Sequence, residues 1–434
     1  MHDFCLHVSF LEVISVCKLL IKSCPSFCCR WLHYESVGFA FMSLSCTRGW
    51  VPGVLSEHQV NDLAKEGWLE NFNLDDPIST DGSAFDLTII GDGYRMLRGS
   101  VKPFGGSYEE DVLKNSKLAE RIEPSNDGVF GLDDHQTYVF RIQQQLASPL
   151  LSSGLIYGQA TAKSSIGRVD VLARLIVDGM DTYESFDPVE AAKQKGRMFI
   201  EVTPMTFKVR VKVGMALSQL RLFKGRPEDC EISGQVLYHS VLRRSSVAGA
   251  SPYRRTAQDG SLSVDLDNAL LCDGESGCAF RAKKASNPEG IALWEENEKP
   301  DPKTYWELWV CDESKGQKYL RIEKDHFYIL RSRERIALPP GVAVYCRATD
   351  ETIGEMRIHY AGFVHPNFGY ERDDEFDGTP LIFEVKGHDF EVTLTNEEVM
   401  ARLTFYRMSK DSEKASTYGK QTLQLSKFFK PWYH

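Results

Sequence analysis

The chain has 434 residues, of which 42% are hydrophobic, and its 61 acidic and 51 basic residues leave a formal charge of -10. This length predicts about two domains with globular cores. The negative charge argues against broad nucleic-acid binding, which needs a basic face that neutralises phosphates. A local basic site for a smaller anion is compatible with this net charge.

The N-terminal segment differs in composition from the rest. Residues 1–46 hold six of the 11 cysteines, and the sparse cysteine use elsewhere predicts a reducing cytoplasm. The apolar run 10–21 contains Glu12 and Lys18, which disfavours both a secretory signal and a membrane span. Translation from Met42 is a third reading, so residues 1–52 are interpreted as an extension that is disordered or not translated.

Two short helices come first in chain order. Ser56 and Gln59 form a capping-box pattern, and Gly67 ends the helix that they begin. A second predicted helix begins at Ser107 and runs through the apolar positions to Leu118.

Predicted strands follow in both halves of the chain. Short apolar runs between Gly, Pro and Ser breaks predict strands, and the alternation over 207–213 is typical of a half-buried one. The predicted strands are 138–142, 155–160, 198–202 and 207–213, then 327–330, 342–345, 381–385 and 402–406. Each half therefore predicts one β-sandwich or barrel, with a polar connector between them.

The two halves match at a shared spacing of 187 residues, which separates Gly154 from Gly341, Ile166 from Ile353, and Gly167 from Gly354. At this offset the run 163–168, Lys-Ser-Ser-Ile-Gly-Arg, aligns with 350–355, Asp-Glu-Thr-Ile-Gly-Glu. Hydroxyls, a permissive glycine and two cations can bind phosphate oxygens, whereas three carboxylates repel them. The first run therefore predicts a polyphosphate site, with a polar surface turn as the alternative. The Arg-Ser-Ser triplet at 244–246 lacks matching strands and is interpreted as an unrelated loop.

Four segments carry a resemblance to a known family: 53–59, Gly-Val-Leu-Ser-Glu-His-Gln; 83–88, Ser-Ala-Phe-Asp-Leu-Thr; 163–168; and 359–369, His-Tyr-Ala-Gly-Phe-Val-His-Pro-Asn-Phe-Gly. In this order they resemble the deoxycytidine triphosphate deaminase branch of the dUTPase-like superfamily, especially its long, internally duplicated bacterial members.

The resemblance implies a mainly β fold of two dUTPase-like repeats, each a β-clip or distorted jelly roll, with a few short helices. We expect an extension over 1–52, a first repeat over 53–225, a connector over 226–320, and a second repeat with a tail over 321–434. The implied ligand is a deoxynucleoside triphosphate with Mg²⁺, and the implied assembly is a homo-oligomer, with a trimer as one form. We expect no nucleic-acid or membrane partner, and a cytoplasmic location.

Glu201 and Glu384 occupy equivalent places on apolar strands. Apolar neighbours raise the pKa of a carboxyl toward the range useful for proton transfer, although strand glutamates often only face water. The resemblance implies that a glutamate on this strand activates water for attack on C4 of cytosine. The hairpin 359–369 keeps the family pattern better than its counterpart 176–188, although His365 and Asn367 depart from the usual Asp-Pro-Gly turn. We therefore expect a composite pocket in which Glu384 shuttles the proton, with Glu201 as the alternative.

The other expected site residues follow the same resemblance: Lys163, Ser164, Ser165 and Arg168 for phosphate, Tyr360 and the Ala361 backbone for cytosine, and Tyr418, Lys420 and Gln421 in a tail that covers the nucleotide. A frayed terminus is the alternative interpretation of that tail.

A zinc mechanism would need H-x-E followed by P-C-x-x-C. His33-Tyr34-Glu35 has no such partner motif, and Cys24, Cys28, Cys29 and His33 have only a loose ligand spacing. We expect no zinc in the chemical step, no protein metal ligands, and Mg²⁺ bound through the triphosphate. The expected function is hydrolytic deamination of dCTP to dUTP and ammonia in deoxynucleotide biosynthesis. The alternatives are a dUTP diphosphatase, alone or combined with deamination, and a non-catalytic nucleotide-binding regulator.

Overall fold

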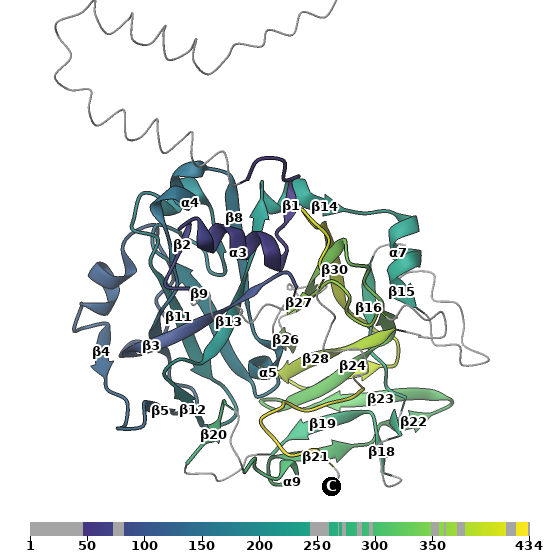
Figure 1. Cartoon of the computed structure of the whole chain (residues 1–434). Helices are drawn as coiled ribbons and strands as arrows, with labels where there is room; N and C mark the ends of the chain where they lie inside the picture. The colour runs from purple at the N-terminus through teal and green to yellow at the C-terminus, as the bar shows by residue number, and fades with distance from the viewer. Residues whose placement is uncertain are drawn as a thin grey trace, which may run out of the picture. The chain divides into compact units, whose positions relative to one another are not determined.

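The computed structural model describes residues 47–72, 82–243, 260–267, 269–270, 275–283, 289–294, 298–348, 356–359, 362–370, 378–413 and 422–432. Its contacts divide the chain into two units, and every element below belongs to the unit Arg48–His434. This part is mainly β with short helices, which confirms the predicted fold class (Figure 1). The proposed start at Met42 and the cysteine cluster of the extension lie outside the described residues.

The first half of the fold, β1 to β13, is organised around a nine-stranded sheet whose main path is β10-β8-β13-β3-β6-β11-β9. Its strands are β1 (Gly53–Val54), β3 (Phe85–Met96), β4 (Ala119–Ile122), β6 (Tyr138–Ile142), β8 (Ile156–Ala162), β9 (Val171–Val177), β10 (Ser185–Phe186), β11 (Met198–Pro204) and β13 (Ala216–Lys224). Smaller sheets join β2 (Leu69–Glu70) to β7 (Gln145–Leu146), and β12 (Val209–Lys212) to β5 (Val129–Leu132) and β20 (Ile291–Ala292).

The second half, β14 to β30, has two main sheets. The five-stranded sheet contains β14 (Glu231–Ile232), β16 (Ser261–Ser263), β25 (Val342–Ala348), β27 (Gly362–Val364) and β30 (Val399–Arg407). The six-stranded sheet contains β15 (Leu242–Arg243), β19 (Ala279–Ala282), β21 (Trp306–Trp309), β24 (Phe327–Ile336), β26 (Met356–His359) and β28 (Thr379–Gly387). Smaller sheets pair β17 (Ala269–Leu270) with β18 (Ser276–Gly277), and β23 (Gln317–Ile322) with β22 (Asp312–Ser314) and β29 (Val392–Thr395).

The helices are short: α3 (Glu57–Lys65), η1 (Glu109–Leu113), α4 (Ser148–Ser153), α5 (Ser164–Gly167), α6 (Pro188–Ala191), η2 (Pro227–Cys230), α7 (Gln235–Val241) and α9 (Pro302–Tyr305). The predicted cap of α3 is present, because Gln59 Oε1 accepts a hydrogen bond from the Ser56 backbone N at 3.1 Å. The helix predicted over 107–118 is shorter, a π-helical turn over η1. It ends there because Asn115 Oδ1 accepts from the Lys117 backbone N, an Asx turn that competes with helix.

The strand pairing of the first half recurs in the second. β8 pairs with β13 and β10, as β25 pairs with β30 and β27. β11 lies between β6 and β9, as β28 lies between β24 and β26. The succession of β1 and α3 corresponds to that of β14 and α7, and β1 and β14 pair with the equivalent strands β13 and β30. The duplication is therefore visible in topology as well as in sequence.

This recurrence corrects the interpretation of 226–320 as a connector. The recurring strand order begins at β14, inside this segment. β15, β16 and β19, which also belong to the segment, pair with β24 or β30 of the second half. Figure 1 shows β14, α7 and β15 among the second-half strands. These strands could not be predicted from the sequence, because each is only two to four residues long and some are polar, as in Ser261–Ser263.

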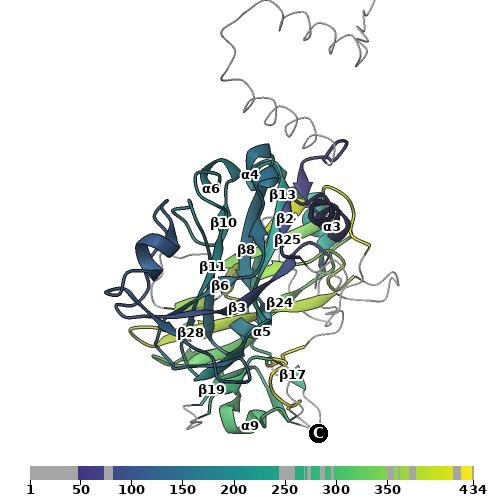
Figure 2. The ribbon, with the colours of Figure 1, turned by 60° about the vertical axis from the view of Figure 1, so that its left-hand side comes forward.

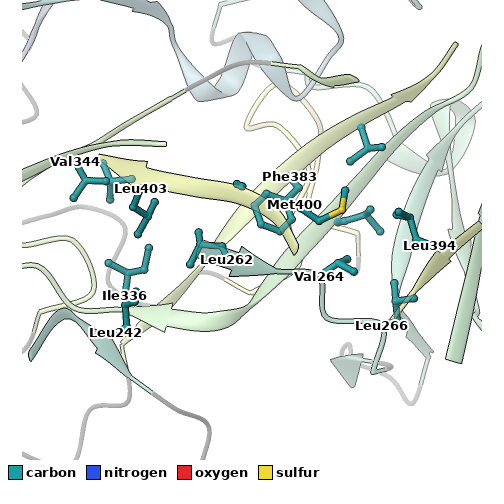
Figure 3. Close-up of a cluster of buried hydrophobic side chains, with 14 of the residues drawn as sticks. Leu242, Leu262, Val264, Leu266, Ile336, Val344, Phe383, Leu394, Met400 and Leu403 are labelled. Atoms are coloured by element: carbon teal, nitrogen blue, oxygen red, sulfur yellow. The ribbon is translucent and has the colours of Figure 1, made fainter. Parts of the chain in front are cut away.

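The core of the second half forms between its two sheets. Leu262 of β16 is fully buried there with Val344 and Leu403, and Ile336 and Phe383 from the other sheet belong to the same cluster (Figure 3). Burial of such side chains is the main favourable term in folding. The presence of Leu262 shows that the supposed connector helps to build this core.

The two halves meet through a smaller apolar cluster that includes Phe223 of β13 and Tyr406 of β30, whose ring centroids are 5.2 Å apart. Both views show α5 where the first-half strands meet β24 and β28 (Figures 1 and 2). This packing brings the phosphate-motif turn of one half to the glutamate strand of the other.

Two further features concern the expected cellular location. Cys278 and Cys311 form a disulfide, which the sparse cysteine use did not predict. Within the described ranges, no helix is both long enough and apolar enough to cross a membrane.

Candidate functional site

A cavity of about 230 Å³ lies between the two halves. The first half lines it with α5 and neighbouring residues, and the second half lines it with β25, β27, β28 and the C-terminal segment. The lining residues are Ala162, Lys163, Ser164, Ser165, Arg168, Gln219, Cys346, Arg347, Ala348, Gly362, Phe363, Val364, His365, Phe368, Leu381, Ile382, Phe383, Glu384 and Lys427. The structure thus brings the described phosphate-motif residues together with Glu384.

Within the motif 163–168, residues Ser164–Gly167 form one turn of helix, α5. α5 connects β8 to β9, with Ile166 buried in the core and Ser164 and Ser165 on the cavity. The Lys163 backbone N donates to the Leu217 carbonyl at 3.0 Å, which ties the start of the turn to β13. The hydroxyls are consequently presented from a fixed backbone.

The two cations of the motif have different partners. Lys163 Nζ lies 2.5 and 2.6 Å from the two carboxylate oxygens of Asp86, so it lines the cavity as one member of an ion pair. Arg168 is only 7% exposed, and its Nε lies 4.0 Å from Glu384 Oε1. The structure therefore contains both expected cations, and the Asp86 carboxylate largely neutralises the charge of Lys163.

The electrostatic character of the lining favours anions. Besides the motif cations, Arg347 and Lys427 line the cavity, and Glu384 is the one carboxylate among its described lining residues. Sequence reasoning missed both added cations. Arg347 precedes the acidic run 350–355 in the sequence, which predicts repulsion of phosphate, and Lys427 reaches the cavity only because the C-terminal segment folds back.

Glu384 lies on β28 and is 6% exposed. Burial raises its pKa from 4.5 to about 8, and the neighbouring Arg168 guanidinium opposes part of that rise. A carboxyl with a pKa in this range can accept and return a proton near neutral pH. The adjacent Cys346 thiol stays protonated, because burial and the Glu384 charge raise its pKa to about 12.

Glu201, the equivalent residue on β11, has different surroundings. Its Oε1 accepts from Arg174 Nη2 at 2.5 Å, and its Oε2 accepts from Ser100 Oγ at 2.6 Å and from Tyr183 Oη at 3.2 Å. It is 1% exposed and does not line the cavity. In the strand register, Arg174 of β9 pairs with Glu201, and His359 of β26 pairs with Glu384 at the equivalent position. The first-half glutamate is therefore held in an ion pair.

β27 contributes Phe363 to the cavity, and the turn that follows it contributes His365 and Phe368. Asn367, one of its departures from the family turn, has φ +64°, a left-handed conformation that asparagine tolerates better than most residues. Gly369 also has a positive φ, and a Cβ there would lie 2.1 Å from the Ile336 carbonyl oxygen. Asn367 and Gly369 therefore both suit the backbone conformation that this turn adopts.

The C-terminal segment folds back against the phosphate motif. Ser426 Oγ donates to the Ser165 carbonyl at 2.7 Å, and the Phe429 ring packs on Tyr305 at 5.4 Å between centroids. The segment therefore borders the cavity, although the expected closing residues are not among those described.

Several expected features lie outside the described residues: Tyr360, Ala361, Tyr418, Lys420, Gln421, the acidic run 350–355 and the triplet 244–246. Their roles stay predictions. No group of three His, Cys, Asp or Glu residues suited to a metal ion occurs within the described ranges.

Comparison with known proteins gives two family matches. Residues 51–226 match the 2'-deoxycytidine 5'-triphosphate deaminase (DCD) N-terminal domain, and residues 240–429 match the C-terminal domain of the same family. The gap between the two matches contains β14, where the recurrence of strand pairing begins.

The crystal structure of 2'-deoxycytidine 5'-triphosphate deaminase from Agrobacterium tumefaciens is similar in fold, with a TM-score of 0.67 and 24% sequence identity. The similarity covers 83% of this chain and 99% of that one. No curated protein sequence matches the chain.

Proposed function

The chain belongs to the 2'-deoxycytidine 5'-triphosphate deaminase family, and from this premise we propose that it hydrolyses dCTP to dUTP and ammonia with Glu384 as proton shuttle. The observation that carries the proposal is the shared cavity, in which Ser164, Ser165 and Arg168 of one half face Glu384 of the other. This arrangement joins an anion-binding turn to a buried carboxyl that can exchange protons.

The α5 end of the cavity suits the triphosphate. Hydroxyls and cations donate charge-assisted hydrogen bonds to phosphate oxygens. Arg168 is already beside Glu384, so a phosphate bound to Arg168 would leave the base of the nucleotide within the part lined by β27 and β28. The cytosine would then meet Glu384.

The proposed chemistry uses Glu384 twice. Its carboxylate takes a proton from water while the water oxygen bonds to C4 of cytosine, and the proton passes to N3. Glu384 next takes the proton of the added hydroxyl and delivers it to the amino group. The C4–N bond breaks, ammonia leaves, and C4 keeps the oxygen as the carbonyl of dUTP.

Magnesium would be bound by the triphosphate rather than by protein ligands. The described residues near α5 offer cations and hydroxyls, which fit phosphate oxygens and not a directly ligated metal. When bound, Mg²⁺ neutralises and orients the phosphates. We also propose that water activation needs no zinc, that the protein acts as a cytoplasmic homo-oligomer, and that its dUTP enters thymidylate synthesis.

Ammonia release from dCTP, measured beside pyrophosphate release from dUTP, tests this function. We expect ammonia without pyrophosphate. Pyrophosphate release would indicate a diphosphatase or a bifunctional enzyme, and nucleotide binding without either product would indicate a regulator.

The assignment of the base has its own test. Glu384→Gln should abolish ammonia release, because an amide cannot carry the proton, and Glu201→Gln should leave most of the turnover of the folded protein. The reverse pattern would contradict the composite pocket.

A further inference from the structure

Arg221 is a buried cation directly behind the cavity wall. It lies on β13 and is fully buried. Its Nη1 donates to the Val344 carbonyl at 3.0 Å, and its Nη2 donates to the Val364 carbonyl at 3.4 Å, both in the second half. Its guanidinium lies 3.9 Å from the centroid of the Phe363 ring. Burying a charge among neutral groups is costly, so this arrangement calls for a role.

The hydrogen bonds of Arg221 run on toward the cavity. Its Nη2 also donates to Ser83 Oγ at 3.1 Å, and Ser83 Oγ lies 3.0 Å from Nδ1 of His365. Ser83 belongs to the first half and His365 to the cavity wall of the second. The three residues therefore form a relay across the two halves.

The direction of this relay follows from the chemistry of its first member. A guanidinium only donates, so the Ser83 oxygen accepts from Arg221. Ser83 is only 1% exposed, and His365 Nδ1 is the acceptor that lies within hydrogen-bond distance of its hydroxyl among the described residues. Because a buried hydroxyl needs an acceptor for its proton, we infer that Ser83 donates to Nδ1. A neutral imidazole that accepts at Nδ1 carries its proton on Nε2. The relay thus selects one of the two tautomers of His365.

His365 is 8% exposed and lines the cavity, and its ring lies 6.3 Å from that of Phe363, an apolar lining residue. An uncharged N–H donor complements an uncharged oxygen acceptor better than a phosphate, which the cations already suit. We propose that His365 determines nucleoside specificity as an Nε2–H donor to a carbonyl or sugar oxygen, and that Arg221 and Ser83 are positioning residues that set this tautomer. The inference rests on the proposed function for the identity of its ligand.

The tautomer is measurable without any turnover. In the full-length protein labelled with ¹⁵N-histidine, the His365 signals are those absent from His365→Gln. We expect an unprotonated Nδ1 and a protonated Nε2 in the wild type, and a redistribution between tautomers in Ser83→Ala. Ser218→Ala is the matched control, because it removes another buried hydroxyl, one that donates to the Thr161 carbonyl at 2.9 Å, and should leave the His365 signals unchanged.

Binding tests the specificity role. The probe is α,β-imido-dUTP with Mg²⁺, which neither deamination nor diphosphate release consumes, and the readout is the calorimetric Kd. His365→Leu should weaken binding about tenfold, as expected for loss of one buried hydrogen bond. His365→Gln should stay within about threefold of the wild type, because its amide N–H replaces Nε2–H. Ser218→Ala should bind as the wild type does.

Two results would overturn the inference: a proton on Nδ1 of wild-type His365, or equal affinity of the His365→Leu variant and the wild type. Ser83→Ala keeps the tautomer test decisive even where His365 variants fold poorly. If the wild type released no ammonia from dCTP while the tautomer and affinity results held, the proposed deamination would fail and the role of His365 would stand.

Discussion

Glu201 and Glu384 show how surroundings divide two residues of equivalent position. Glu201 accepts hydrogen bonds from Arg174, Ser100 and Tyr183, which fix the position of its carboxylate. Glu384 is buried beside the cavity with Arg168 4.0 Å away, and its pKa is raised to about 8. One carboxylate is held in place, and the other can exchange its proton.

The raised pKa of Glu384 predicts a pH dependence of catalysis. Its basic form accumulates as pH rises toward about 8, so kcat/KM for dCTP should rise about tenfold per pH unit below that value and then level off. Initial rates of ammonia release at low dCTP concentration from pH 5.5 to 9.5 measure this rising part of the pH profile, the acid limb. A flat profile over that range would show that Glu384 does not govern the step.

Arg168→Ala should shift this limb to higher pH, because the guanidinium lowers the pKa of Glu384. It should also weaken triphosphate binding about tenfold or more, as expected for the loss of a charge-assisted hydrogen bond. Arg168→Lys keeps the charge and is the matched control for the position of the limb. Unchanged triphosphate affinity in Arg168→Ala would argue against the phosphate site.

The raised pKa of Glu384 and the ion pair of Glu201 predict opposite stability changes in two conservative variants. The folded-state pKa of Glu384 lies above the unfolded value near 4.5, so its contribution to stability is lost as pH rises between them. Glu384→Gln removes that loss and should become more stable relative to the wild type as pH increases from 5 to 8. Glu201→Gln leaves Arg174 without its carboxylate and should be less stable by roughly 3 kcal/mol.

Urea denaturation of both variants and the wild type across this pH range provides the measurement. A pH-independent difference between Glu384→Gln and the wild type would mean that the carboxyl titrates alike in folded and unfolded chains.

At the scale of elements, a buried ion pair joins β28 to the turn after α5. Lys386 Nζ lies 2.7 Å from Asp170 Oδ2, and Asp170 is fully buried with a positive φ of 54°. Each partner is two residues from a cavity residue, Lys386 from Glu384 and Asp170 from Arg168. The pair therefore positions the two sides of the proposed site.

Removing one partner should cost more stability than removing both. Lys386→Met or Asp170→Asn alone leaves a buried group without its counterpart and should destabilise the fold by about 3–5 kcal/mol. The double variant should recover much of this loss, yet its kcat should stay about tenfold or more below the wild type, because the spacing of Arg168 and Glu384 is no longer held. Denaturation and ammonia assays measure the two effects, and full recovery of kcat in the double variant would contradict a positioning role.

The elements also show where local sequence was sufficient. The strand over 138–142 was predicted to the residue, and 381–385 lies within β28, because each combines β-branched or aromatic residues with clear breaks. The short strands within 226–320 were missed, because their apolar residues are too few to show a period and their pairing partners lie far along the chain.

For the whole molecule, the central feature is one cavity lined by both halves of a single chain. This geometry predicts that two defective chains cannot rescue each other. Chains carrying Arg168→Ala and chains carrying Glu384→Gln, co-expressed with different tags and purified as mixed assemblies, should show no more ammonia release than the average of the single variants. Restored activity would mean that sites form between chains. Wild-type chains mixed with the double variant provide the control for assembly.

The sequence by itself determined the fold class, the internal duplication, the family and the two candidate glutamates, because these depend on periodicity and on motifs read along the chain. It also pointed to a composite pocket from the unequal preservation of the two repeats. Only the tertiary structure decided which of these residues share a cavity, that Asp86 pairs with Lys163, and that Arg221 and Ser83 stand behind His365. Such relations depend on burial and on contacts between distant segments, and local sequence patterns predict neither.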